Sequence, residues 1–160
     1  MTSAAFRFLA GGVAALATAC STGNEPDGPD LSVILASEPA PTIDQYGLFA
    51  DPSGRELSEG VVAYDLINPL FSDHAAKHRA VFVPTGETIS YDGEEAFEFP
   101  VGSVLIKTFA FAPDMRAPDV GERYLETRLL IRKADGWQAY PFIWNADETE
   151  ARYAPVGGKQ

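Results

Sequence analysis

Two runs of alternating side chains, joined by an Asp-Gly step, constrain the fold of this chain most strongly. In residues 124–133 apolar and polar side chains alternate, as on a strand with one buried face. The buried face consists of Leu125, Thr127, Leu129 and Ile131, and the charged face of Glu126, Arg128 and Arg132. Asp135-Gly136 then supplies a dipeptide that favours a tight hairpin turn, and residues 137–144 follow as the partner strand. The pattern predicts an antiparallel hairpin.

Most of the remaining chain is divided into short apolar runs by glycine, proline and Asp-Gly turns. Further strands are predicted at residues 61–66, 80–83, 88–91, 95–99 and 104–111. The last of these is apolar on both faces apart from Lys107 and Thr108, which is typical of a central strand covered on both sides. One short helix is expected near residues 72–79, capped by Ser72 or Asp73. These elements predict an all-β fold, an antiparallel β-sandwich or a jelly-roll-like domain.

The first twenty residues have the layout of an export signal. Arg7 precedes the apolar run 8–19, which is shorter than the roughly 20 residues that a membrane-spanning helix needs. The run ends at Cys20 and resembles the signal of a bacterial lipoprotein, in which this cysteine is lipidated. Ordinary secretory cleavage after Ala19 also fits the small residues there. We therefore expect export, with residues 1–19 as signal peptide and Cys20 as the anchor to the outer membrane or the periplasmic face.

The segment after the cysteine is polar and rich in Gly and Pro, and such a composition buries too little surface to order itself. Residues 20–44 are therefore assigned to the lipidated cysteine and a flexible tether. A single β domain is expected over residues 45–156, followed by a tail at 157–160.

The charge of the chain limits its partners. Twelve Lys and Arg against 23 Asp and Glu give a formal net charge of −11. Phosphate backbones require clustered cations, so nucleic acid is not an expected partner. An acidic domain is not drawn to anionic lipid headgroups either, so the expected membrane contact is the lipid anchor. The single cysteine excludes an intrachain disulfide and a multi-cysteine metal centre.

No convincing catalytic constellation is present in the sequence, and no metal site is predicted. His74 and His78 lie four residues apart on the expected helix, but two ligands without an H-E-x-x-H pattern do not make a metal site. Tyr140, Phe142 and Trp144 share one strand face, and such a stripe fits either the core or a platform that stacks on sugars.

The stretch from residue 64 to 79 mixes polar and aromatic side chains in a predicted loop region, where binding residues concentrate. The best candidates for contact with a ligand or partner are Tyr64, Asp65, Asn68 and Asp73. Their alternative role is to cap and pin a structural loop.

An ordered series of motifs extends over most of the expected domain, in residues 46–49, 60–79, 99–109, 126–130, 136–137 and 142–145. Together they resemble the N-terminal region of a family of exported bacterial proteins and lipoproteins, whose longer members are similar to dihaem c-type cytochromes. Covalent haem c needs a C-x-x-C-H segment, and this chain has no cysteine after Cys20. The resemblance therefore implies haem c in the longer relatives alone, and no cofactor in this chain.

The expected function is that of a non-catalytic, extracytoplasmic binding or docking domain whose partner is a protein of the cell envelope. The alternative is a carbohydrate-binding or glycan-active domain that uses the stripe of Tyr140, Phe142 and Trp144. Exposure of this stripe in a groove favours the alternative, and its burial favours docking.

Overall fold

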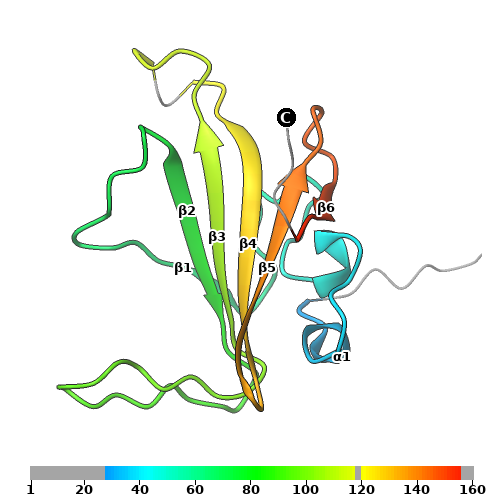
Figure 1. The fold of residues 1–160 in the computed structure, drawn as a ribbon, viewed down its shortest axis with the longest axis vertical. Coiled ribbons are helices and arrows are strands. Elements are labelled where there is room, and N and C mark those ends of the chain that lie inside the picture. The colour runs from blue at the N-terminus through cyan, green and yellow to red at the C-terminus, as the bar shows by residue number, and fades with distance from the viewer. Residues whose placement is uncertain (1–27, 118–119, 156–160) are drawn as a thin grey trace, which may run out of the picture.

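A computed structural model describes residues 28–117 and 120–155 of the chain. Within these residues, six strands form one antiparallel sheet in the order β1-β2-β3-β4-β5-β6, so each strand pairs with its neighbour in sequence (Figure 1). The elements are α1 (Leu31–Ile34), the 3-10 helix η1 (Ile43–Tyr46), β1 (Val61–Ala63), β2 (Ala76–Phe82), β3 (Val104–Phe111), β4 (Arg123–Lys133), β5 (Gly136–Trp144) and β6 (Ala151–Tyr153). The predicted all-β class is confirmed.

The hairpin predicted from the alternating runs is formed by β4 and β5. Leu129 lies opposite Tyr140, and Lys133 lies opposite Gly136. The connection is therefore the two residues Ala134 and Asp135, one position earlier than the predicted turn. Gly136 begins β5 with a φ of 141°, a backbone conformation that side chains rarely adopt.

A bulge changes which side chains of β4 face the core. Glu126 lies opposite Phe109 of β3, but Tyr124 lies opposite the next residue, Ala110, so Leu125 is the extra residue. Tyr124 is consequently buried, whereas Leu125 is only half-buried. The rest of the predicted buried face is confirmed by the burial of Thr127, Leu129 and Ile131.

The segment between residues 28 and 58 forms the second layer of the domain. It covers one face of the sheet and buries Ile34, Ile43, Tyr46 and Leu48 completely or almost completely. The ring of Tyr46 meets Phe142 of β5 edge-on at 5.7 Å. A coiled segment with two short helices thus stands where a sandwich would have a second sheet (Figure 1). Residues 31–44 belong to the predicted tether of residues 20–44, but Ile34, Ala40 and Ile43 are buried in the core, so this part of the prediction is corrected.

The prediction of a helix near residues 72–79 is wrong. The chain enters β2 at Ala76, and Asp73 and His74 just before it have φ values of 44° and 64°, which are incompatible with a right-handed helix. Every second residue of β2 instead faces the core layer, ending in the buried Ala80 and Phe82. Pairing with β3 along its whole length stabilises the strand in place of a helix.

Residues 83–103 leave the sheet between β2 and β3 and extend past its end (Figure 1). Two strands are predicted here, and the structure has one isolated bridge, between Ser90 and Glu98. The excursion exposes Tyr91 and Phe97 to solvent.

Candidate functional site

The four predicted binding residues lie on the loop that connects β1 with β2. Tyr64 continues the edge of the sheet, and its backbone N–H donates to the carbonyl of Arg79 at 3.0 Å. Asp65 accepts a hydrogen bond from Arg79 Nη1 at 2.9 Å. Asn68 and Asp73 are exposed further along the loop and do not line the cleft that Tyr64 and Asp65 help to form. The structure therefore brings two of the four residues together.

That cleft, of about 280 Å³, lies between β2 and the segment that covers the sheet. His78 Nε2 is 2.9 Å from Glu122 Oε2 at its rim, and the guanidinium of Arg55 lies 4.3 Å from the centre of the Tyr124 ring. Arg55 also donates to Glu148 and to the carbonyl of Glu122. These contacts join the covering segment to the loops at the end of the sheet.

The buried polar residues beneath this cleft are paired with one another. Thr108 Oγ1 lies 2.8 Å from Thr127 Oγ1, which in turn accepts a hydrogen bond from Trp144 Nε1 at 2.9 Å. Both threonine hydroxyls are therefore engaged in a structural network between β3, β4 and β5. Burial raises the pKa of the nearby Tyr124 hydroxyl.

The aromatic stripe of β5 belongs to the core. Tyr140, Phe142 and Trp144 are between 0% and 8% exposed beneath the covering segment. A buried ring has no free face for a sugar, so the interpretation of these three residues as a stacking platform is wrong.

The opposite side of the sheet, here named the open face, carries a row of three cations. Arg79 of β2 lies directly opposite Lys107 of β3, and Lys107 lies directly opposite Arg128 of β4. Directly paired residues point to the same side of a sheet, and like charges in such positions destabilise it. Lys77 adds a fourth cation on the same side of the sheet, two residues before Arg79 on β2.

Lys107 stands at the centre of this row. Partial burial lowers the pKa of its ammonium group, and the charges of Arg79, Lys77 and Arg128 lower it further. Arg79 is balanced by Asp65, and Arg128 by Glu126. Among the described residues, no carboxylate forms an ion pair with Lys107, whose Nζ instead lies 4.7 Å from the centre of the Phe109 ring. The arrangement can attract and hold an anionic group.

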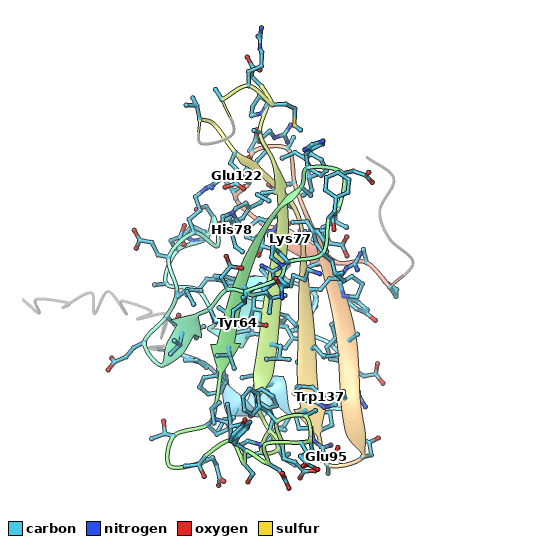
Figure 2. All side chains as sticks on the ribbon, turned by 90° about the vertical axis from the view of Figure 1, so that its left-hand side faces the viewer. Tyr64, Lys77, His78, Glu95, Glu122 and Trp137 are labelled. Carbon is cyan, nitrogen blue, oxygen red and sulfur yellow. The ribbon has the colours of Figure 1, made fainter. Side chains whose placement is uncertain are left out.

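Aromatic side chains gather at the other end of the open face. Figure 2 shows Lys77 toward one end of the sheet and Trp137 with Glu95 toward the other. Trp137 and the excursion of residues 83–103 line a groove of about 580 Å³ there. The open face thus has a cationic half and an aromatic half.

Sequence reasoning missed the cationic row. The alternation in residues 124–133 already places Arg128 on a charged face, and Lys107 interrupts an otherwise apolar strand. The sequence thus indicates that each of these two cations has an unusual position in its strand. Only the register of β2, β3 and β4 shows that they are neighbours.

Comparison with known protein families, with curated proteins and with solved structures finds no match for this chain.

Within residues 28–117 and 120–155, no three His, Cys, Asp or Glu side chains gather closely enough to hold a metal ion. His74 packs against Phe71, whereas His78 contacts Glu122, so the two histidines have different neighbours. In the same part of the chain, no helix has the length and apolar character needed to cross a bilayer. The predicted lipidation site, Cys20, lies outside the described residues.

Proposed function

We propose that this chain is a non-catalytic docking domain of an exported, lipid-anchored protein, and that the open face of its sheet receives an acidic surface of a protein in the cell envelope. The observation that carries the proposal is the row of Arg79, Lys107 and Arg128. Three cations aligned across adjacent strands lower stability. Their proximity is favourable once an anionic surface lies over them.

The surroundings of the row support the same function. Phe109 lies between two cations, with Lys107 Nζ at 4.7 Å and Arg128 Cζ at 4.9 Å from its ring centre. Glu126 fixes the Arg128 guanidinium through two hydrogen bonds. A cation held in place loses less conformational freedom when a partner carboxylate binds. Asp65 accepts one hydrogen bond from Arg79, whose side chain is only 7% exposed, so Arg79 adds its positive charge to the row while Asp65 lies at the border of the face.

Binding of a hexaglutamate peptide tests the docking face. We expect binding at low ionic strength, about 0.01 M, and its loss at about 0.5 M salt, because screening shortens the Debye length. Lys107→Glu should weaken binding about tenfold, since it removes one favourable charge and adds a repulsive one. Arg116→Glu is the matched control, because Arg116 is exposed on the loop after β3 and pairs locally with Asp114.

A hexaglutamate affinity that falls equally in both variants would indicate an effect of net charge alone and would overturn the docking face. Circular dichroism and urea unfolding of each variant check that the fold is unchanged.

The export and anchoring part of the proposal rests on the signal-like first residues and Cys20. Metabolic labelling with a fatty acid in a bacterial host, followed by membrane fractionation, tests it. We expect label on the wild-type protein and none on Cys20→Ser, which should be released from the membrane fraction. Equal membrane association of the two proteins contradicts the lipid anchor.

A further inference from the structure

The groove at the far end of the open face adjoins the cationic row through Leu105 and Leu130, but its walls have a different chemistry. Its aromatic walls are Tyr91, Phe97, Phe99 and Trp137, and Glu95 lies at its side; these five residues are named the aromatic groove. Tyr91 is 72% exposed, Phe97 57% and Trp137 40%. Large aromatic side chains gathered in one exposed patch indicate a contact site.

The rings of the aromatic groove stand at steep angles to one another. Tyr91 and Phe97 are 5.2 Å apart at 50°, and Phe97 and Phe99 are 6.5 Å apart at 88°. Phe99 and Trp137 are 5.5 Å apart at 74°. Rings at such angles do not make the flat platform on which a sugar stacks. At these distances the rings pack against one another, so the surface that they leave for a cation consists of their solvent-exposed faces.

The excursion that carries three of these rings is uniformly acidic. Between residues 84 and 103 the carboxylates are Glu87, Asp92, Glu94, Glu95 and Glu98, and the segment has no Lys or Arg. Arg132, opposite Trp137 in register, donates to the carbonyl of Lys133 at 2.8 Å. The five carboxylates of the excursion outnumber this one guanidinium, so the net charge around the groove complements a positively charged ligand.

We propose that the aromatic groove binds a basic, extended segment of a partner protein and holds a Lys or Arg side chain against the exposed faces of its rings. The carboxylates extend along the excursion well beyond the groove. A peptide segment with several positive charges matches this distribution better than a single small cation does. The inference is independent of the docking of an acidic surface on Arg79, Lys107 and Arg128.

Trp137 provides the readout, because it lines the groove while Trp144 is only 4% exposed. The probe is the peptide acetyl-Pro-Lys-Pro-Arg-Pro-amide, titrated while Trp fluorescence is recorded and repeated by calorimetry. We expect Phe97→Ala to weaken binding about tenfold and Glu95→Gln about threefold, in line with cation–π contacts and exposed ion pairs. Glu94→Gln is the matched control, with the same loss of charge at a residue outside the groove lining, and should stay within about twofold.

A second peptide separates charge from apolar contact: norleucine replaces Lys and citrulline replaces Arg. Binding of this neutral peptide should fall about tenfold. Equal binding of both peptides, or equal effects of Glu95→Gln and Glu94→Gln, overturns the proposed cation site. The proposal is also overturned if analytical ultracentrifugation shows that the chain forms a dimer and that Phe97→Ala abolishes this dimer, because a second copy then occupies the groove. The two proposals have different probes, hexaglutamate for the cationic row and the basic peptide for the groove, so failure here is distinguishable from failure of the docking face.

Discussion

Replacing Lys107 by methionine is expected to stabilise the folded domain, whereas the same substitution at Lys133 is expected to destabilise it. Both lysines have a pKa lowered first of all by burial. They differ in their partners. Lys107 faces cations across both neighbouring strands, and Lys133 donates from Nζ to the carbonyls of Ile34 and Ala36, each at 2.7 Å.

The size of the gain at position 107 follows from its two cross-strand neighbours. A like-charge pair in directly opposite positions costs about 0.2–1 kcal/mol, and the carboxylates beside Arg79 and Arg128 reduce this repulsion. Methionine keeps an apolar chain against Phe109 without the charge. We therefore expect Lys107→Met to raise the free energy of unfolding by about 0.5–1 kcal/mol and the melting temperature by about 3 °C.

The loss at position 133 follows from buried hydrogen bonds. The two carbonyls belong to the segment that covers the sheet, and Lys133 is only 7% exposed. Hydrogen bonds to a charged group contribute about 1.5–3 kcal/mol each, and removing the donor leaves buried acceptors without a partner. Lys133→Met should therefore lower the free energy of unfolding by about 2–4 kcal/mol.

The pH dependence of the Lys107 effect has a definite sign. Because its pKa is lower in the folded than in the unfolded protein, the folded state binds fewer protons in the interval between the two values. The native state therefore carries the full penalty below its own pKa, and the penalty is relieved as pH rises toward the ordinary lysine value of about 10.5. The advantage of Lys107→Met over wild type should shrink across that interval.

Urea unfolding followed by circular dichroism, at neutral pH and at two salt concentrations, measures both effects. Salt should reduce the gain of Lys107→Met, because it screens the repulsion between exposed charges. It should leave the loss of Lys133→Met largely unchanged, because that loss comes from buried bonds. A Lys107→Met protein that is less stable than wild type refutes the repulsive row, and a neutral Lys133→Met refutes the role of its two carbonyl partners.

Further substitutions test the covering layer and the core. Gly47→Ala should cost about 3 kcal/mol or more in urea unfolding, because φ is 64° and a Cβ would lie 2.0 Å from the carbonyl oxygen of Gly28. Gly60→Ala should cost only about 1 kcal/mol, since φ is 84° but the space is free; equal costs contradict the close approach. Trp144→Phe should lower the free energy of unfolding by about 1–2 kcal/mol through loss of the bond to Thr127, and a neutral result contradicts that bond.

The parts of the fold that could be predicted from the sequence are those set by local patterns. The β4–β5 hairpin follows from alternation and a turn dipeptide, both of which act within a few residues. Neither the alternation nor the turn dipeptide predicts the bulge at Leu125, because the bulge depends on the pairing of β4 with β3. Residues 76–79 carry Lys, His and Arg and lack a clear apolar alternation, so the pairing that makes them a strand is not visible locally.

The covering layer could not be predicted for a similar reason. Residues 36–42 are rich in Pro and small residues, as linkers are. They are held by contacts to distant residues: Tyr153 donates from its backbone N–H to the carbonyl of Pro41 at 2.9 Å, and Lys133 reaches the carbonyl of Ala36. Hydrogen bonds between residues so far apart in sequence produce no hydrophobic periodicity in the segment itself, so the sequence does not reveal them.

The pattern of β3 connects the fold with the proposed function. Its residues are apolar on both faces except at Lys107 and Thr108, as in a strand covered on both sides. Within the described residues, the face of Val104 and Ile106 is fully buried, whereas the other face is only partly covered. On the other face, Leu105 and Phe109 remain half-buried beside the cations. This composition is suited to contact with a further molecule, and the proposed docking face assigns that contact to an acidic surface. Repulsion within the row and attraction to an acidic surface are then two consequences of one arrangement, so a variant that gains stability at Lys107 should lose affinity for the hexaglutamate peptide.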